Sequence, residues 1–535
     1  MTKTFLNLTL LLAMTAPLAA ADKFYSDDPL KNEPAPRDAA GVKGRKLNDY
    51  YDLIENSFKK RGERNTPQLT IRARDVNTLG EPMDGAWYTH RHYFNPMTLE
   101  QLQLGAGGKN PPSPDGPWTV VSAKSEGITP GFVMTDAKND EYFVKFDPVS
   151  NPELATGAEM ICSRFFHALG YHVPDYYLIH FDRQKLLLGK NVQFRDAVGR
   201  KRVMTQEDLD NLLAKVPKTN DGGFRAIVSL QIAGKPVGPF KYFGTRGDDP
   251  NDIVPHEHRR ELRGLGVFAA WLDHNDSRSI NSLDTLVQAS GTTYLRHHLM
   301  DFGSTLGSLS TSAKIARSGG EYYLDFKPVP KQIATFGLAV PYWAHASYPG
   351  YPSVGGFEAA TFRPDQWVPD YPNAAFLNRL PDDEFWAAKQ VMAFSDEQIR
   401  AIVKVAQFSD PAAERYVADT LIARRDKIGK AYLGRVLPLD RFAVEQEQLV
   451  YHDLAAEHGL EVKGQLHVTW SRFDNKTSEK TPIPGAQDFH VPAAEGGNSY
   501  LAANIWRGDD TAKAITVYLR MTGGQAEVVG IDRTW

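Results

Sequence analysis

The stretch Trp271-Leu-Asp-His-Asn-Asp276-Ser-Arg-Ser-Ile-Asn281, followed later by Asp301-Phe302-Gly303, decides how this chain of 535 residues is interpreted. Carboxylates and an amide recur in it at spacings that suit metal-assisted phosphoryl transfer, a reaction that depends on positioned charge more than on covalent chemistry. Between the two halves, strand-like runs flank Ala289-Ser290-Gly291, which predicts a hairpin. We therefore expect both halves to serve one site.

Upstream of this stretch, the pattern predicts strands, a tight loop and a helix. Residues 118–124 and 132–135 alternate in polarity as strands do, and the loop at 126–131 between them contains Gly127 and Gly131. A third strand at 141–147 carries Lys145, and the helix that follows, beginning near residue 151 or 156, carries Glu159. These elements would form a nucleotide site above the Asp276 loop.

Each charged residue of this pattern has an expected role in phosphoryl transfer. Lys145 would reach the phosphates under the glycine-containing loop, and Glu159 would pair with the lysine and hold it straight. Asp276 would face the acceptor hydroxyl. Asn281 and Asp301 would bind Mg²⁺ through oxygen, the ligand atom that this hard cation prefers.

Three motifs resemble those of kinases. His274-Asn275-Asp276-Ser-Arg-Ser-Ile-Asn281 resembles the catalytic loop H-R-D-x-x-x-x-N, Asp301-Phe302-Gly303 resembles D-F-G, and Tyr142-Phe-Val-Lys145 is similar to the strand with the phosphate-binding lysine. The order of elements agrees over residues 118–310. The chain looks most like the atypical branch, with bacterial persistence-toxin, secretory-pathway and phosphoinositide kinases. The resemblance implies a two-lobed fold, ATP, Mg²⁺ and a hydroxyl acceptor.

The sequence also departs from the kinase pattern. Asn275 stands where the catalytic loop has arginine, the glycine-rich pattern is reduced to two glycines, and no A-P-E follows the D-F-G-like motif. Asp273 is a second candidate for the base. Asp276 is preferred because it alone lies five residues before Asn281.

Together these patterns predict an α+β protein with a two-lobed kinase-like fold, a β-rich N-lobe and a mostly helical C-lobe. Alternation at 462–470 and 515–520 predicts a C-terminal all-β domain. The expected divisions are a signal peptide (1–21), an N-terminal extension (22–117), an N-lobe with insertions (118–255), a C-lobe with the catalytic loop (256–435) and the β domain (436–535).

The amino terminus has the pattern of a secretory signal peptide. Lys3 precedes an apolar run from Phe5 to Leu18, which ends in Ala19-Ala20-Ala21. Because the run is short for a membrane span, we expect export to the periplasm or the extracellular space without stable membrane insertion. The single cysteine, Cys162, allows no intrachain disulfide, and the net charge of −4 predicts no binding to nucleic acid.

Two polar clusters have a structural interpretation beside the functional one. A Thr156-Gly-Ala-Glu159 capping box would give Glu159 a structural role instead of a pairing role. His256-Glu-His258 and His297-His298 lack the spacing expected of metal ligands on one helix face, so we expect neither pair to bind a metal.

Surface features have equally simple interpretations. Arg259, Arg260 and Arg263 are expected on the solvated face of a helix at 256–272. An amphipathic helix is expected at 46–60. The aromatic residues between 337 and 372 are expected to pack, with a glycan platform as the alternative: Trp343, Tyr348, Tyr351 and Trp367.

The sequence therefore favours an exported atypical kinase that transfers the ATP γ-phosphate to a hydroxyl of a protein, glycan or lipid. One alternative is a catalytically silent kinase-like scaffold of the cell envelope, because compartments outside a bacterial cytoplasmic membrane hold little ATP. The other is a protein nucleotidyltransferase that uses the same cleft. An envelope or extracellular partner is expected to bind the C-terminal β domain.

Overall fold

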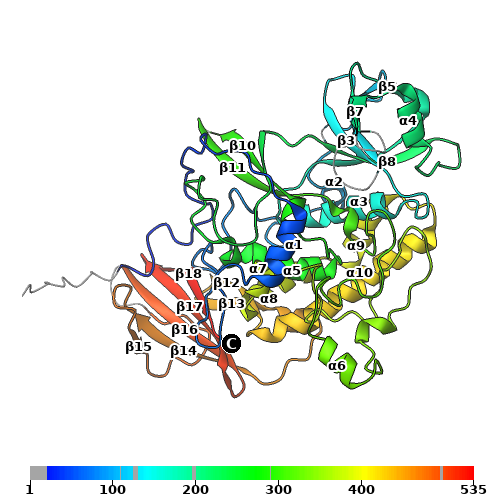
Figure 1. Ribbon diagram of the computed structural model, residues 1–535. Coiled ribbons are helices and arrows are strands. Elements are labelled where there is room, and N and C mark those ends of the chain that lie inside the picture. Colours follow the sequence, from blue (N-terminus) through cyan, green and yellow to red (C-terminus); the bar gives the residue numbers. More distant parts are fainter. Residues whose placement is uncertain (1–20, 109, 124–129, 196–199, 290, 494–497) are drawn as a thin grey trace, which may run out of the picture.

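The computed structural model describes residues 21–108, 110–123, 130–195, 200–289, 291–493 and 498–535, which form a mixed α/β protein (Figure 1). One sheet-rich region lies at the upper right of the view, helices occupy the centre, and a second sheet lies at the lower left. Within the described residues, no helix has both the length and the apolar character needed to cross a bilayer.

A six-stranded sheet forms the region that contains Lys145. Its strand order is β4-β8-β3-β2-β1-β5, with β1 and β5 parallel and the other neighbours antiparallel. The strands are β1 (Trp118–Ala123), β2 (Gly131–Thr135), β3 (Glu141–Lys145), β4 (Tyr176–Phe181), β5 (Leu186–Leu188) and β8 (Phe224–Leu230). The strands predicted around residues 118, 132 and 141 are thus confirmed. A separate pair, β6 (Gln193–Arg195) and β7 (Lys201–Val203), lies beside them.

The two faces of this sheet pack against different helices. Tyr142 and Val144 of β3 join a hydrophobic cluster with Leu209 and Leu213 of α4 (Gln206–Leu213). Since side chains alternate along a strand, Lys145 lies on the other face, where α3 (Leu154–Ala168) contacts the sheet.

The central core is helical and surrounds α5 (Arg260–Trp271), whose twelve residues are all buried. Helices α7 (Ala374–Leu377), α8 (Pro381–Met392) and α10 (Pro411–Tyr432) contact α5. Helices α3 and α9 (Asp396–Val403) complete this core, with α2 (Leu99–Leu104) against both of them. Ser395 caps α9 through a capping box with Gln398. The prediction for the arginines was wrong: Arg259, Arg260 and Arg263 are at most 6% exposed, because carboxylates from other elements pair with them inside the core.

A hairpin of β10 (Ser282–Ala289) and β11 (Thr292–Leu299) returns the chain to the loop that precedes it, with β9 (Lys235–Gly238) along its other edge. Ser282 pairs with Leu299, and the Met300 amide donates to the Asn281 carbonyl at 3.0 Å. The predicted hairpin is confirmed, and its register brings Asn281 and Asp301 to the same end.

The second sheet is antiparallel and belongs to the C-terminal part of the chain. Its order is β15 (Lys480–Pro482), β14 (Leu466–Phe473), β16 (Asn498–Arg507), β17 (Asp510–Thr522) and β18 (Gln525–Arg533). The pair β12 (Leu439–Glu445) and β13 (Gln448–Asp453), followed by α11 (Leu454–Glu457), packs with it. Phe24 packs against Tyr500 and Tyr518, so the first described residues lie on this sheet.

Two short helices have exposed apolar residues. Helix α1 (Asp49–Phe58) falls within the predicted 46–60 helix, but its apolar residues other than Leu53 are solvent-exposed rather than packed. Helix α6 (Val329–Ala334) has no buried residue and lies at the lower edge of the molecule in Figure 1.

Candidate functional site

Lys145, Glu159 and Asp301 meet in one ion cluster. The Nζ atom of Lys145 lies 3.0 Å from Oε1 of Glu159 and 2.9 Å from Oδ1 of Asp301. The side chain of Glu159 is 2% exposed, whereas those of Lys145 and Asp301 are 21% and 39% exposed. The lysine thus pairs with two carboxylates. Glu159 is buried and fixes the lysine, whereas Asp301 is within reach of solvent. The expected convergence of the strand lysine and the D-F-G-like aspartate is present in the structure.

Helix α3 places Glu159 by a route that differs from the capping-box interpretation. Its N-cap is Glu153, and Thr156 lies inside the first turn. The Thr156 amide and hydroxyl donate to the Asp147 carboxylate at 2.8 and 2.7 Å. Glu159, one turn later, accepts from Lys145 instead. The capping box is therefore absent at Thr156, because Asp147 satisfies the helix end.

The backbone at Asp301 is held in a left-handed conformation. Its φ is 62°, and its amide donates to the Tyr176 hydroxyl at 3.3 Å. The next residue, Phe302, is fully buried and stacks on Phe166 of α3 with ring centroids 4.9 Å apart. Burial of Phe302 thus anchors the segment, while the Asp301 carboxylate remains beside Lys145.

The Asp276 loop is held from both sides. The Asn281 amide nitrogen donates to the Asp276 carbonyl at 2.8 Å, which closes the loop. His274 is buried, and its ring meets those of Phe166 and Phe302 edge-on. Burial lowers the pKa of His274 to about 3, so its imidazole is neutral at pH 7 and acts in packing.

Arg278 is a functional candidate that sequence reasoning missed. Its guanidinium forms an ion pair with the Asp276 carboxylate, and its Nη1 donates to Asp49 of α1 at 2.9 Å. The signal was present, since Arg278 lies inside the quoted loop. The contribution of Asp49 had no sequence signal, because 229 positions separate the two residues.

The charges of the site shift one another's protonation. Burial raises the pKa of Glu159, and the Lys145 ammonium opposes this shift. For Lys145 itself, burial favours the neutral form, but the charges of Asp301 and Glu159 outweigh it and raise the pKa above its ordinary value. Burial also raises the pKa of Asp276, against the nearby Arg278. The lysine is therefore fully charged at neutral pH.

Asn281 and Asp301 supply oxygen atoms of the kind that a hard divalent cation binds. Because the Asn281 amide nitrogen donates to Asp276, the group that Asn281 can offer a cation is its amide oxygen. In the part of the chain that the structure describes, no group of three or more His, Cys, Asp or Glu residues could hold a metal by itself. A cation here would share its ligands with substrate phosphates, as Mg²⁺ sites with one or two carboxylates do.

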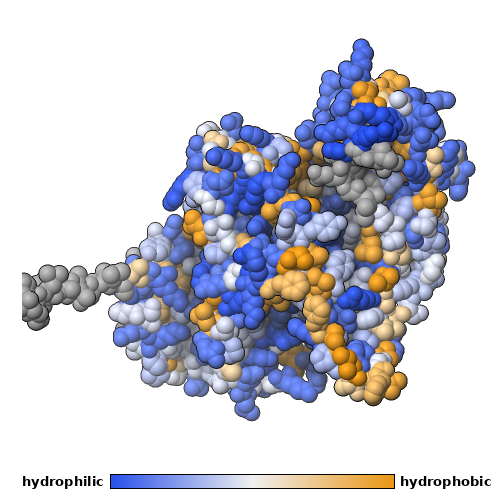
Figure 2. Space-filling view, viewed as in Figure 1, coloured by the Kyte–Doolittle hydropathy of each residue, from blue (hydrophilic) through white to orange (hydrophobic). Residues whose placement is uncertain are grey.

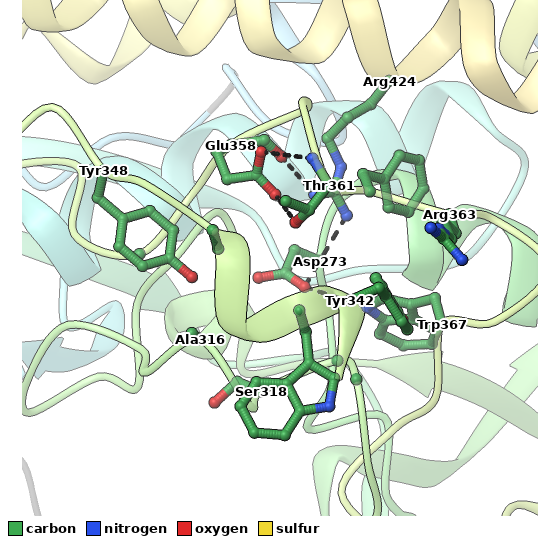
Figure 3. A pocket seen from close by; sticks show the side chains of 16 residues that line it. Asp273, Ala316, Ser318, Tyr342, Tyr348, Glu358, Thr361, Arg363, Trp367 and Arg424 are labelled. Carbon is green, nitrogen blue, oxygen red and sulfur yellow. Dashed lines mark hydrogen bonds and ion pairs between the residues drawn. The ribbon is translucent and has the colours of Figure 1, made fainter. Parts of the chain in front are cut away.

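Asp273, the other candidate base, has a structural position. It lines a polar pocket beside the loop (Figure 3), where its Oδ2 lies 3.0 Å from Nζ of Lys314 and its Oδ1 accepts from Trp367 Nε1 at 3.1 Å. Three of the four predicted packing aromatics, Trp343, Tyr348 and Trp367, line the same pocket. The buried Lys314 and the partly buried Trp367 thus hold Asp273, whose side chain is 8% exposed against 14% for that of Asp276.

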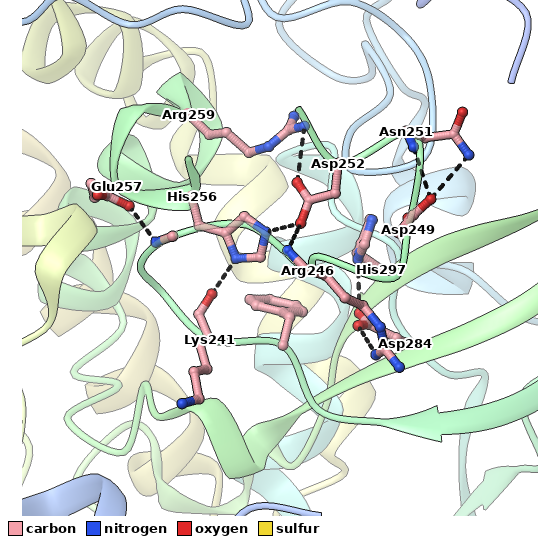
Figure 4. A network of polar contacts seen from close by, with 12 residues as sticks. Lys241, Arg246, Asp249, Asn251, Asp252, His256, Glu257, Arg259, Asp284 and His297 are labelled. Atoms are coloured by element: carbon pink, nitrogen blue, oxygen red, sulfur yellow. Dashed lines mark hydrogen bonds and ion pairs between the residues drawn. The ribbon is translucent and has the colours of Figure 1, made fainter. Parts of the chain in front are cut away.

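His256 and His297 belong to a buried polar network at the base of the hairpin (Figure 4). His256 Nε2 lies 2.7 Å from Oδ2 of Asp252, and His297 Nδ1 lies 2.7 Å from Oδ1 of Asp284. Arg246 bridges the two carboxylates: its backbone amide donates to Asp252, and its Nη1 donates to Asp284. Each imidazole has its own carboxylate, which favours a structural role.

The glycine-containing loop is described only at its end. Gly131 begins β2 and pairs with Lys145 of β3. Gly127 lies outside the described residues, so its expected place above the phosphates stays a prediction.

The chain matches no protein-family model and no curated protein. Solved structures that resemble it include three of kinases. A Helicobacter pylori proinflammatory kinase, CtkA, aligns with 59% of this chain and 98% of its own at 12% identity and a TM-score of 0.30. A Golgi casein kinase aligns with 76% of this chain and 96% of its own, at 10% identity and a TM-score of 0.27. The Golgi casein kinase with Mn and ADP bound aligns with 62% of this chain and 75% of its own, at 11% identity and a TM-score of 0.26.

Because the TM-scores are 0.30 or lower, the functional interpretation depends on the contacts among Lys145, Glu159, Asp301 and the Asp276 loop rather than on the alignments.

Proposed function

We propose that the protein is an atypical kinase that transfers the γ-phosphate of ATP to a hydroxyl of a protein, glycan or lipid. The observation that carries this proposal is the Lys145 ammonium, which lies within 3.0 Å of carboxylate oxygens of both Glu159 and Asp301. These residues come from a strand, a helix and a segment after a hairpin, in the order in which kinases use them.

In this proposal each residue acts through the geometry described above. Glu159 holds Lys145 so that its ammonium meets phosphate oxygens. Asp276 orients the acceptor hydroxyl and accepts its proton, and Arg278 supplies positive charge beside it. Asn281 and Asp301 offer oxygens to Mg²⁺, which when bound would neutralise charge that develops on the phosphates.

The proposal includes an arrangement and a location. The six-stranded sheet with its flanking helices would be the N-lobe (118–255), and the helical core would be the C-lobe (256–435). Residues 22–117 would form an extension, and residues 436–535 a β domain that binds an envelope or extracellular partner. The apolar amino terminus supports cleavage after residue 21 and export to the periplasm or beyond.

The test is the change in thermal stability on adding ATP and Mg²⁺. A nucleotide at 100 times its dissociation constant should stabilise the protein by about 2.7 kcal/mol. Asp301→Ala should abolish this Mg²⁺-dependent gain and leave the melting temperature without ligand nearly unchanged, because Asp301 is partly exposed. Asp426→Ala is a matched control, since Asp426 is 47% exposed and lies on α10.

Two results would contradict the kinase proposal. Unaltered Mg²⁺-dependent binding in Asp301→Ala would remove the metal role of that residue. If the unsubstituted protein shows no shift at millimolar ATP, the chain would instead be a kinase-like scaffold without turnover.

A further inference from the structure

Residues 326–340 form the most exposed apolar segment in the described chain. Ile333, Phe336 and Leu338 have 71%, 94% and 83% of their surface in contact with solvent. The neighbouring apolar residues Phe326, Val329 and Val340 are also exposed. Figure 2 shows apolar side chains gathered at the lower edge of the molecule, where Figure 1 places α6. Exposed apolar groups in such number indicate an interaction surface.

The charge of this segment is of one sign. Residues 326–340 contain Lys327 and Lys331, both exposed, and neither Asp nor Glu. The apolar side chains stand out from the surface, since Phe336 is almost fully exposed, so the segment is convex. A convex apolar surface with interspersed lysines complements the interface of an anionic bilayer, where lysines meet phosphates and apolar groups enter the acyl boundary.

Helix α1 presents a second surface of the same character. Tyr50, Tyr51 and Phe58 are exposed. The three acidic residues of the helix are held by partners, and Glu55 forms ion pairs with Lys59 and Arg61. Asp49 binds Arg278, and Asp52 is buried and accepts from the Tyr371 hydroxyl at 2.7 Å. The outward side is therefore aromatic, and it continues into the exposed Lys59 and Lys60.

Both surfaces are tied to the catalytic-loop sequence. Helix α1 is joined to it by the pair of Asp49 and Arg278. The other segment is joined through Asp370, whose carboxylate accepts from the Asn275 side chain at 2.6 Å and whose carbonyl accepts from the Tyr323 amide at 2.7 Å. Helix α1 therefore contacts the Asp276 loop directly, whereas residues 326–340 are linked to it through Tyr323, three residues before the segment, and Asp370.

We propose that residues 326–340, with the outer side of α1, form a peripheral docking surface for an anionic lipid bilayer. Docking would bring the Asp276 loop close to the headgroup layer. The acceptor hydroxyl would then be one carried at that layer, a consequence that depends on the proposed kinase function, whereas the docking itself does not.

The experiment measures vesicle co-sedimentation without ATP. The chain beginning at Ala21, which keeps every described residue, is mixed with vesicles of equal parts phosphatidylcholine and phosphatidylglycerol, and separately with phosphatidylcholine alone. We expect binding to the anionic vesicles, weakened by salt. Phe336→Ser should reduce the partition coefficient about tenfold or more, and Ile333→Ser by a similar amount. Lys331→Gln should reduce it about fivefold.

The matched control is Ile253→Ser, because Ile253 is 75% exposed and lies outside both surfaces. This variant should bind as the unsubstituted protein does, and all variants should keep its melting temperature. Absence of binding to anionic vesicles, or equal losses in Ile253→Ser and Ile333→Ser, would overturn the proposal. Self-association that Phe336→Ser abolishes, without vesicle binding, would assign the surface to a second copy of the chain. Failure here leaves the ATP-binding test unaffected.

Discussion

The ion cluster around Lys145 and the ion cluster around Asp383 are built from the same kinds of groups but differ in their contact with solvent. Asp383 accepts from Arg260 Nε at 3.1 Å and from Arg263 Nη1 at 3.2 Å, and the three side chains are between 0% and 8% exposed. In the other cluster, Lys145 and its partner Asp301 are 21% and 39% exposed.

The difference separates charges that hold the fold from charges that can meet a ligand. Ions that are removed from water on every side stabilise only as a complete set, so the Asp383 cluster links α5 to α8 permanently. Lys145 pairs with the buried Glu159 and also with Asp301, whose side chain is 39% exposed, so this cluster borders solvent on the Asp301 side.

The largest expected effect on stability is at the buried cluster of Asp383, Arg260 and Arg263, called here the closed cluster. Asp383→Ala removes the partner shared by Arg260 and Arg263 and also the acceptor for the Leu380 amide at the start of α8. We expect the free energy of unfolding to fall by about 3–5 kcal/mol, measured by urea denaturation. A loss below about 1 kcal/mol would show that water reaches this cluster.

Asp370 is an intermediate case, a buried acid beside the Asp276 loop. Burial, with the charge of Asp276, raises the pKa of Asp370 to about 6. A raised folded-state pKa means that the folded protein binds the extra proton, so stability decreases as pH rises from about 4 to about 6. Asp370→Asn removes this penalty while keeping an oxygen for Asn275.

Unfolding free energies of Asp370→Asn and the unsubstituted protein should therefore diverge with pH. The variant should gain relative stability as pH rises from 4 to 7, by up to about 3 kcal/mol. A constant difference across this range would mean that Asp370 ionises in the folded protein as it does in the unfolded chain.

The partly exposed cluster of Lys145, Glu159 and Asp301 should tolerate the loss of its cation better than the closed cluster tolerates the loss of Asp383. Lys145→Met leaves Glu159 unpaired, and because burial already raises the pKa of Glu159, this carboxylate can take up a proton. We expect the free energy of unfolding to fall by about 2 kcal/mol at neutral pH, and by less at acidic pH, where Glu159 is protonated. Urea denaturation at neutral and at acidic pH measures this difference. A loss as large as that of Asp383→Ala would show that the two clusters do not differ in their role in stability.

The smallest effect is expected for an ion pair in water. Asp419 pairs with Arg400, and the two side chains are 61% and 44% exposed. Asp419→Asn should change the free energy of unfolding by no more than about 0.5 kcal/mol. A larger change would indicate that exposure is a poor guide to the role of a charge in this protein.

Local sequence was sufficient for much of the site. Spacing and alternation predicted the Lys145 strand, the Glu159 helix and the hairpin before Asp301, because each depends on neighbours a few residues away. The same local reasoning was wrong for Arg259, Arg260 and Arg263. A helix with three arginines is expected to expose them unless carboxylates distant in sequence, such as Asp383, pair with them. The residues next to α5 in sequence give no indication of such partners.

The sequence by itself determined which groups are available: a strand lysine, a helix glutamate, and a loop with aspartate and asparagine. Only the tertiary structure decided that Lys145 contacts Asp301 across 156 positions, that Asp273 is held by Lys314, and that Asp49 reaches Arg278. It also left the aromatic side of α1 exposed, although the pattern there is that of a buried face. The reason is physical, since periodicity specifies which side of an element is apolar, whereas packing between distant elements specifies what covers it.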